Sequence, residues 1–583
     1  MLKTLAKSIR EFKGYSIITP ILVAFEVVME CLIPFTAANL IENIRAGCGL
    51  DTIVSYGIRL IAMALISLAF GAIAGRTCAT ASTGFARNLR HDLFHRVQGF
   101  SFENIDRFSS SSLVTRMTTD VANVQMAYMM IIRTAIRSPF MLIFSLFMAF
   151  YMGGAMAVIF VLVIPVLGGG LFLVIRLTMP LFRRVFRKYD RLNESIEENV
   201  AGMRVVKSFV REEHEKKKFG DAAETVCMDF TKAEKILAFN APLMQLCMYS
   251  VMIFVMYFGA KTIISATGEG SFGVGQMSAL LTYGAQILFS LMMLSMIFVM
   301  VTLSYESATR ISEVLKEEST IKSPENAITE VKDGSVAFKG VSFRYSRSAS
   351  VDALSDVDLS IASGESVGIL GGTGSSKTTL IQLISRLYDV TSGAVLVGGQ
   401  DVRDYDLDVL RNEVSVVLQK NLLFSGTIKE NLRWGNPNAT DEEIVSACRM
   451  AQADEFVSAF PDGYDTYIEQ GGTNVSGGQK QRLCIARALL KKPKILILDD
   501  STSAVDTKTD ALIRRAFREY IPETTKIIIA QRISSVMDAD KIVIMESGRI
   551  AAVGTHDELM QSNDMYREIY ESQQKGKEES DEN

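Results

Sequence analysis

The stretch LGGTGSSKTTL, residues 370–380, decides the fold of the second half of the chain. It follows the apolar run SVGIL (366–370) and fits the phosphate-binding pattern G-x-x-x-x-G-K-[ST], except that Ser376 stands at the last glycine position. In such a loop, successive backbone N–H groups and the N-terminus of the following helix bind phosphate oxygens. The stretch therefore predicts a strand, a loop and a helix that together bind a nucleotide.

Ser376 places a Cβ where the backbone must approach a phosphate closely. At negative φ a serine fits this position at little cost, whereas at positive φ it strains the loop, and the sequence leaves both conformations open. The next two residues have defined roles in this pattern. Lys377 would reach the β and γ phosphates, and the hydroxyl of Thr378 would hold Mg²⁺.

A second stretch, KILILDD (494–500), supplies the metal-binding partner of the loop. Its four apolar residues, 495–498, predict a buried strand that ends at Asp499. A carboxylate at that point would hold the Mg²⁺, usually through water. After about residue 310, short β-rich runs alternate with helical segments, which is typical of an α/β nucleotide-binding domain.

The first half of the chain is strongly apolar, and hydrophobic residues make up 48% of the whole. Residues 138–175 carry no charge, and as one helix they would be roughly 57 Å long against a hydrocarbon core of ~30 Å. This stretch must therefore fold back, with the turn at YMGGA (151–155). With the other apolar spans it predicts six transmembrane helices. These other spans are 15–41, 54–75, 236–260 and 270–305.

The distribution of basic residues predicts how the helices cross the membrane. Lysine and arginine cluster before the first span and in the second-to-third and fourth-to-fifth connections, so both termini are expected in the cytoplasm. The net charge of −4 gives no support to a nucleic-acid partner. The basic residues of these three clusters are Lys3, Lys7, Arg10, Lys13, Arg87, Arg90, Arg96, Arg183, Arg184, Arg187 and Lys188.

The segment NVSGGQKQR (474–482) closely resembles the LSGGQ signature of ATP-binding-cassette (ABC) proteins, and it lies between the phosphate loop and Asp499 as in that family. NVAGMRVVKSFVREEHEKKKF (199–219) resembles the second intracellular loop of ABC exporters. The resemblance covers nearly the whole chain. It implies a half-transporter of the type IV, domain-swapped fold: an all-α membrane domain of six helices followed by an α/β P-loop ATPase domain. Coupling helices are expected near 101–107 and 187–191.

The resemblance also implies site residues, because each matches a family motif in this sequence. The cofactors would be ATP and Mg²⁺. The expected ATP-binding residues are Tyr345, Gly371, Gly372, Thr373, Gly374, Ser375, Ser376, Lys377, Thr378, Thr379 and Gln419. The expected Mg²⁺-holding residues are Thr378, Gln419 and Asp499. The signature residues that would contact ATP bound to a partner chain are Ser476, Gly477, Gly478 and Gln479.

Two positions of the catalytic centre depart from the family pattern. Asp500 stands where the family has its general base, a glutamate, and Gln531 stands where it has the switch histidine. An aspartate is one methylene shorter, which moves the carboxylate by roughly 1 Å and can cost ~10²-fold in rate. Glutamine still donates a hydrogen bond but carries no charge. One interpretation is neutral drift with Asp500 as a poorer base, and the other is a degenerate site that binds ATP and hydrolyses it slowly or not at all.

The substrate candidates lie in the membrane half. Glu26 and Glu30 share a helix face midway along the first span, where a carboxylate is costly, so they could attract cationic substrates or carry protons. Pairing with Arg133 or Arg137 is the alternative. Methionines repeat every four residues in the fifth and sixth spans and suit a promiscuous apolar surface, but ordinary packing explains them equally well. The methionine candidates are Met248, Met252 and Met296.

These observations predict a membrane domain (1–310), a linker (311–334), an ABC nucleotide-binding domain (335–572) and a disordered tail (573–583). The resemblance implies ATP-driven export of hydrophobic or amphipathic compounds, drugs or lipids, across a bacterial cell membrane. The impaired site beside an intact signature favours a heterodimer with a second half-transporter over a homodimer. A homodimeric lipid flippase or drug exporter, and a nucleotide-gated membrane regulator with little turnover, remain alternatives.

Overall fold

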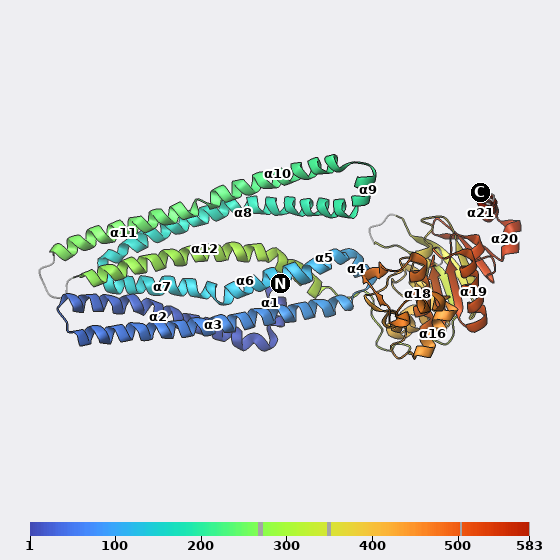
Figure 1. The fold of residues 1–583 in the computed structure, drawn as a ribbon, viewed down its shortest axis with the longest axis horizontal. Coiled ribbons are helices and arrows are strands. Elements are labelled where there is room, and N and C mark those ends of the chain that lie inside the picture. The colour runs from blue at the N-terminus through green and yellow to red at the C-terminus, as the bar shows by residue number, and fades with distance from the viewer. Residues whose placement is uncertain (266–271, 347–350, 502–503, 582–583) are drawn as a thin grey trace. The chain divides into compact units, whose positions relative to one another are not determined.

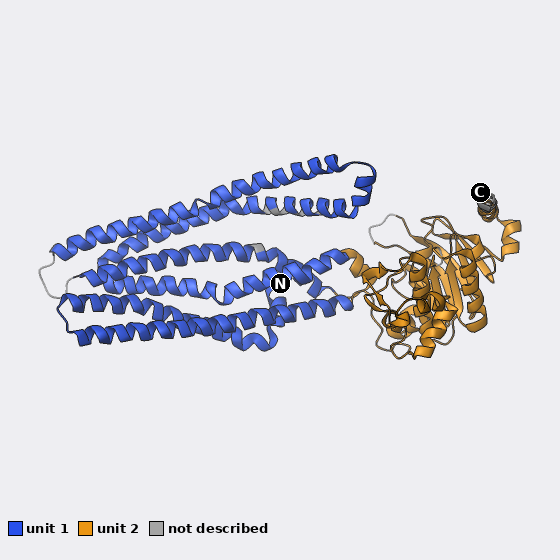
Figure 2. Ribbon diagram, in the orientation of Figure 1, with its two compact units in different colours: residues 1–99, 109–317 blue, residues 100–108, 318–583 orange. Residues whose placement is uncertain are grey.

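The computed structural model describes residues 1–265, 272–346, 351–501 and 504–581 (Figure 1). It divides into two compact units (Figure 2). The first unit holds residues 1–99 and 109–317, and the second holds residues 318–583 together with the short segment 100–108. The predicted first domain thus lacks one short segment, which packs with the ATPase domain instead.

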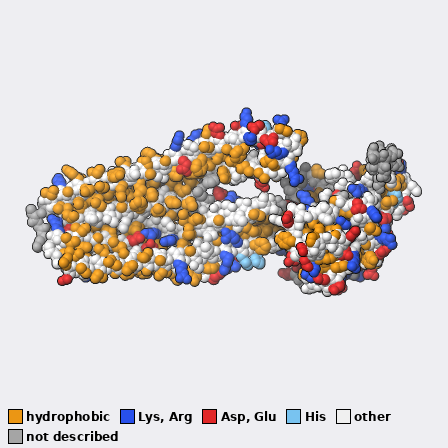
Figure 3. All heavy atoms as spheres, viewed as in Figure 1, with side chains coloured by type: hydrophobic (Ala, Val, Ile, Leu, Met, Phe, Trp, Pro, Cys, Tyr) orange, Lys and Arg blue, Asp and Glu red, His pale blue; other side chains and the backbone are white. Residues whose placement is uncertain are grey.

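The first unit is helical throughout. Its main helices are α1 (Leu2–Ala6), α2 (Lys13–Arg45), α3 (Leu50–Gln98), α5 (Ser110–Thr115), α6 (Val121–Ile132), α7 (Thr134–Gly153), α8 (Val158–Ala201), α9 (Met203–Ser208), α10 (Glu212–Leu237), α11 (Asn240–Ser265) and α12 (Val274–Lys316). Figure 3 shows hydrophobic side chains over much of the face of this unit that is in view, as expected where lipid rather than water is the solvent.

Within the described residues, five helical stretches are long and apolar enough to cross a membrane. One of them, Ser110–Phe182, contains α7 and the first part of α8, which Figure 1 shows running in opposite directions, so it accounts for two crossings. The chain reverses where α7 ends at Gly153 and Gly154 takes a φ of +51°. Six passes and a turn within 151–155 therefore agree with the prediction.

The helices are much longer than a membrane is thick. The 49 residues of α3 span about 74 Å, against a hydrocarbon core of ~30 Å. The prediction of a coupling helix near 187–191 is wrong, because α8 continues unbroken to Ala201 through residues that favour helix. The chain first breaks at Gly202, and the short helix α9 lies in the turn between α8 and α10. A short helix, α4 (Phe102–Phe108), lies where the other coupling helix is predicted.

The second unit is an α/β domain. Its strands are β1 (Val336–Phe343), β2 (Leu354–Ile361), β3 (Ser366–Leu370), β4 (Ser392–Val397), β5 (Gln400–Asp401), β6 (Val414–Val417), β7 (Gly426–Thr427), β8 (Tyr467–Ile468), β9 (Ile495–Asp499), β10 (Thr525–Ile529), β11 (Lys541–Glu546) and β12 (Arg549–Gly554). Its helices are α4, α13 (Lys377–Ile384), α14 (Leu407–Glu413), α15 (Ile428–Arg433), α16 (Asp441–Met450), α17 (Asp454–Ser458), α18 (Gly477–Leu490), α19 (Thr507–Tyr520), α20 (His556–Ser562) and α21 (Asp564–Asp581).

The central sheet has six strands in the order β12-β11-β3-β10-β9-β6. All neighbours pair in parallel except β11 and β12. Every residue of β9 and β10 is buried, as near-continuous apolar runs predict for strands covered on both faces. A second, antiparallel sheet has the order β2-β1-β4-β5.

The end of the chain differs from the predicted disordered tail. Helix α21 continues to Asp581, and residues 582–583 lie outside the described part. The segment is charged, but its Lys, Glu and Gln residues are good helix formers, and a charged composition alone does not distinguish a solvated helix from a disordered chain.

Candidate ATP site

Four neighbouring strands of the central sheet build the site. Across the sheet these strands follow the order β3-β10-β9-β6, and all four run parallel to one another. Their carboxyl ends therefore meet at one edge, which is where ligands bind in open α/β sheets. At this edge β6 leads to Gln419, β9 ends at Asp499, β10 leads to Gln531, and β3 leads to the phosphate loop. The topology thus gathers residues that lie far apart in the sequence.

The phosphate loop joins β3 to α13 and contains three residues with positive φ. Gly371 has φ +156° and Gly374 has φ +84°. Ser376 adopts the left-handed conformation, with φ +69° and ψ +26°. The structure thereby selects the strained alternative, because a left-handed conformation costs a residue with a Cβ roughly 1 kcal/mol or more. Nothing lies within 4 Å of a Cβ built at Gly372 or Gly374, so the loop stays open beside its backbone N–H groups.

Lys377 lies over the loop that it follows. Its Nζ donates to the carbonyl oxygens of Gly371 and Gly372, both at 2.8 Å, and to Oγ of Ser375 at 3.2 Å. Burial lowers the pKa of Lys377, and the charges of the nearby aspartates oppose that shift. The ammonium group is therefore held where phosphate oxygens would meet the loop.

Thr378 and Asp499 form the oxygen cluster that Mg²⁺ prefers. Oγ1 of Thr378 donates to the two carboxylate oxygens of Asp499 at 3.0 and 3.2 Å. Asp499 is 3% exposed, and burial raises the pKa of its carboxyl. A hydroxyl and a carboxylate in contact are hard oxygen ligands suited to Mg²⁺ held with water and phosphate. The residues present thus fit ATP with Mg²⁺, which would neutralise phosphate charge. Gln419, the third expected ligand, contacts Asp500 instead.

Asp500 and Gln531 are in direct contact. Nε2 of Gln531 donates to Oδ2 of Asp500 at 2.8 Å, and Nε2 of Gln419 lies 3.5 Å from the same oxygen. Asp500 has a φ of +49°, a conformation that aspartate tolerates better than most residues. Burial raises the pKa of Asp500, while the two glutamine amides act in the opposite direction. The two predicted catalytic positions therefore form one hydrogen-bonded pair.

Tyr345 lies at the entrance to the site, after β1. Its side chain is 48% exposed, and its hydroxyl hydrogen-bonds with Oγ1 of Thr379 at 2.9 Å and Oε1 of Gln382 at 3.2 Å. Its ring packs edge-on against Tyr388, with the centroids 5.2 Å apart. A half-exposed ring fixed beside the start of α13 can stack on an adenine base.

The signature forms the N-terminus of α18. Ser476 is the N-cap: its Oγ accepts from the backbone N–H of Gln479 at 3.3 Å, and its own N–H donates to Oε1 of Gln479 at 2.9 Å. Gly477 and Gly478 follow, and a Cβ at Gly478 would lie 2.9 Å from the carbonyl oxygen of Ala504. The exposed helix start favours an anion such as a phosphate.

Sequence reasoning missed two contacts around the site. The hydroxyl of Tyr388 donates to Asp106 of α4 at 2.6 Å, which ties a segment from the membrane half to the ATPase domain. Gln573 of α21 holds the loop after β10: its Nε2 donates to the carbonyl oxygen of Gln531 at 2.9 Å, and its Oε1 accepts from the N–H of Ile533 at 2.9 Å. No local motif marks Asp106 or Gln573, so only the fold reveals them.

The substrate candidates belong to the first unit. Glu26 and Glu30 both accept hydrogen bonds from the guanidinium of Arg137, at 2.8 Å each. The two glutamates therefore pair with an arginine, which was the alternative to a role in substrate binding. Met252 and Met296 are exposed, whereas Met248 packs against the apolar core of the unit.

Comparison with known proteins identifies the family of both halves of the chain. Residues 16–292 match the ABC transporter transmembrane region, and residues 354–503 match the ABC transporter family. The chain is 36% identical to the uncharacterized ABC transporter ATP-binding protein YfiB of Bacillus subtilis (strain 168), over 97% of this chain and 98% of that one. It is 31% identical to the ATP-dependent lipid A-core flippase of Desulfotalea psychrophila, over 84% of each chain.

The fold also has a solved counterpart. The structure of a bacterial Atm1-family ABC exporter with ATP bound superposes with a TM-score of 0.83 at 24% identity, and the match covers 96% of this chain and 99% of that one. The chain therefore belongs to the ABC transporter family, as a half-transporter in which a helical transmembrane domain is fused to one ATP-binding domain on the exporter fold.

Proposed function

We propose that this chain is one half of a heterodimeric exporter that moves hydrophobic or amphipathic compounds, drugs or lipids, across a bacterial cell membrane. Its own ATP site binds ATP with Mg²⁺ but hydrolyses it slowly. Its signature, Ser476 to Gln479, completes a competent ATP site on the partner chain. The ATPase domain and both termini lie in the cytoplasm.

The contact between Asp500 and Gln531 carries this proposal. The phosphate-binding parts are in place, since Lys377, Thr378 and Asp499 cluster at one sheet edge. The two positions that act on the attacking water hold a shorter carboxylate and an uncharged amide, and these bond to each other at 2.8 Å. The ATP-binding residues thus match the family, while the general-base and switch positions both differ from it. This combination suits a site that binds ATP without hydrolysing it rapidly.

The signature supports the asymmetric arrangement. Ser476 and Gln479 form a complete capping box in which the side chain of each accepts a hydrogen bond from the backbone N–H of the other, which stabilises the start of α18. A homodimer would combine two impaired sites, whereas a partner with glutamate and histidine at the two changed positions would give one complete site.

Subunit composition tests the proposal. The chain is tagged, extracted gently from its native membrane and purified with whatever remains bound. We expect an equimolar second half-transporter that has glutamate after its Mg²⁺-binding aspartate and a switch histidine. The control is co-expression of this chain with two different tags. If the two tags purify together as a homodimer with sustained, substrate-stimulated ATPase activity, the heterodimer proposal is wrong.

Lipid transport is the second candidate for the cargo. The observation that favours it is the 31% identity to a protein described as an ATP-dependent lipid A-core flippase. A lipid cargo predicts that purified complex in vesicles moves a labelled phospholipid between leaflets in an ATP-dependent way. Movement of soluble amphipathic dyes without any lipid movement would favour a drug cargo instead.

A further inference from the structure

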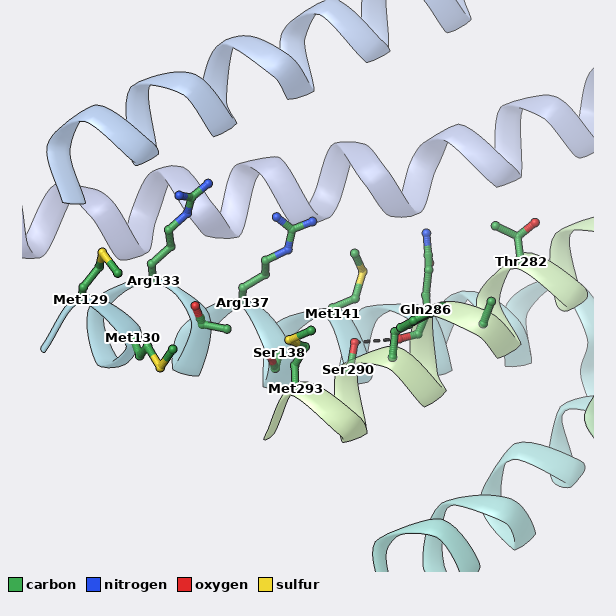
Figure 4. Close-up of a pocket in the computed structure, with 13 residues that line it drawn as sticks. Met129, Met130, Arg133, Arg137, Ser138, Met141, Thr282, Gln286, Ser290 and Met293 are labelled. Carbon is green, nitrogen blue, oxygen red and sulfur yellow. Dashed lines mark hydrogen bonds between the residues drawn. The ribbon is translucent and has the colours of Figure 1, made fainter. Parts of the chain in front are cut away.

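The membrane unit contains a cavity of about 570 Å³ between α6, α7 and α12 (Figure 4). Its volume lies within the ~300–1,000 Å³ range of sites that hold drug-sized ligands. Much of its wall is methionine and phenylalanine, which give a polarizable surface that adapts to apolar groups of varied shape. These residues are Met129, Met130, Met141, Met293 and Phe289.

Two arginines supply the charged part of the cavity wall. Arg133 lies at the junction of α6 and α7, and Arg137 lies one turn further on (Figure 4). No aspartate or glutamate is among the described residues that line the cavity. A charged side chain at membrane depth is costly, so it marks a functional site by default.

The two arginines differ in what they contact. Arg137 is paired, because Nη1 donates to Glu26 of α2 and Nη2 donates to Glu30 of α2, at 2.8 Å each, and neither glutamate lines the cavity. The guanidinium of Arg133 makes no hydrogen bond or ion pair with the described residues, whereas its backbone N–H donates to the carbonyl oxygen of Met129. Its guanidinium lies beside Gly75 of α3, where an added Cβ would sit 3.6 Å from Nη1, and a glycine there offers no acceptor side chain.

The Arg133 guanidinium thus has N–H donors to offer to a ligand. These donors form a planar fork that matches a carboxylate or a phosphate. The charges of Glu26, Glu30, Arg133 and Arg137 sum to zero, so the cavity would select an anion through these donors and not through an excess of positive charge. A cation would instead meet two arginines on the wall.

We propose that this cavity binds an amphipathic anion, with a carboxylate or phosphate on Arg133 and an apolar body against the methionines. The inference rests on the proposed export function, for which it names the substrate class. It replaces the expectation that Glu26 and Glu30 attract cations, because both carboxylates are turned to Arg137.

Binding of a matched pair of probes tests the inference. The complex, purified from its native membrane into phosphatidylcholine nanodiscs, is titrated with fluorescent dansyl-undecanoic acid and with its uncharged methyl ester. We expect the acid to bind at least about tenfold more tightly than the ester, because the carboxylate accepts charge-assisted hydrogen bonds from Arg133 that the ester cannot match. Arg133→Gln should abolish that preference while leaving ester binding unchanged, and Arg133→Lys should keep part of it.

Arg176 provides the control, because it lines a different membrane cavity together with Phe172 and Phe298. Arg176→Gln should leave the preference for the acid intact. Equal binding of acid and ester by the wild type, or an unchanged preference in Arg133→Gln, would overturn the inference. Since the assay needs neither ATP turnover nor transport, a failed export function would leave probe binding untouched and would be recognised separately.

A second arm identifies the source of the anion. Phosphatidylglycerol is added to the nanodiscs, and the acid probe is titrated again. Displacement of the probe that depends on Arg133 assigns the site to an anionic membrane lipid. Retention of the probe assigns it to a soluble amphipathic anion.

Discussion

At the scale of single residues, the proposed slow hydrolysis would follow from the reach of the Asp500 carboxylate and not from its basicity. Burial raises the pKa of Asp500, which would make it a stronger base, while the hydrogen bonds from Gln531 and Gln419 oppose that shift. What the aspartate lacks is one methylene, or roughly 1 Å toward an attacking water, a displacement that can cost ~10²-fold in rate. The amide of Gln531 also donates a hydrogen bond to Oδ2 of Asp500, which leaves the carboxylate fewer acceptor sites for a water.

Restoring length and charge should therefore restore turnover. We expect Asp500→Glu to raise single-turnover hydrolysis at this site by up to ~10²-fold, and more when combined with Gln531→His, because the histidine frees the carboxylate and can carry charge. The measurement uses the complex with the partner's phosphate-loop lysine replaced, so that only this site reports. Asp500→Asn is the control: if it abolishes substantial activity, Asp500 is already an effective base.

Because Ser376 of the phosphate loop is left-handed, we expect its replacement by glycine to strengthen ATP binding. Ser376→Gly removes the Cβ at φ +69° and should tighten ATP binding by up to about 1 kcal/mol, or roughly fivefold in Kd. Equilibrium nucleotide binding measures the change. Thr373→Gly is the matched control, because Thr373 lies in the same loop without a positive φ and should gain nothing. Weaker binding by Ser376→Gly would mean that the serine hydroxyl contacts the nucleotide.

At the scale of elements, the sequence predicted the parts of the site that follow buried strands. The apolar run of β9 ends at Asp499, so composition placed that residue at a strand end, whereas Gln531 after β10 was identified through the family resemblance. The turn at Gly154 could be predicted because a single uncharged helix would have been too long for a membrane. The second coupling helix was misplaced because α8 stays helical through charged residues, with no local signal before Gly202.

Contacts between distant elements could not be predicted in the same way. The choice of Arg137 as the partner of Glu26 and Glu30 depends on how α2 and α7 pack, and Arg133 was equally placed in sequence. The conformation of Ser376 depends on the loop as a whole. The docking of α4 on Tyr388 joins residues 282 positions apart.

This docking predicts a coupling defect. Tyr388→Phe removes the hydrogen bond to Asp106 and keeps the ring that packs near Phe102. Because Asp106 is exposed, the loss should be modest, about 1 kcal/mol. We expect basal ATPase activity to persist and its stimulation by transported substrate to fall several-fold, measured on the purified complex. Tyr464→Phe is the control, since it removes a similar tyrosine–aspartate bond (Asp454, 2.6 Å) elsewhere in the domain. Equal effects of both variants would indicate a general loss of stability.

At the scale of the whole molecule, each ATP site would combine residues of two chains, so a change in this chain would affect two different sites. In the proposed assembly, Lys377 would belong to this chain's own slow site, whereas Ser476 would belong to the site of the partner. In a heterodimer these two residues therefore make unequal contributions to total hydrolysis. In a homodimer both residues serve identical sites, and their losses would be comparable.

Comparing the two residues measures this asymmetry. In the native complex, Ser476→Ala should lower steady-state ATPase activity by at least about tenfold, because it removes a hydroxyl that faces the phosphates of the partner's ATP. Lys377→Ala should cost only a few-fold. Thr440→Ala is the matched control: Thr440 caps α16 with the same capping box, so its loss costs a similar ~1 kcal/mol of helix stability without touching a nucleotide. Equal losses from Ser476→Ala and Lys377→Ala would contradict the asymmetric assembly, and a loss of the same size from Thr440→Ala would assign the Ser476 effect to helix stability alone.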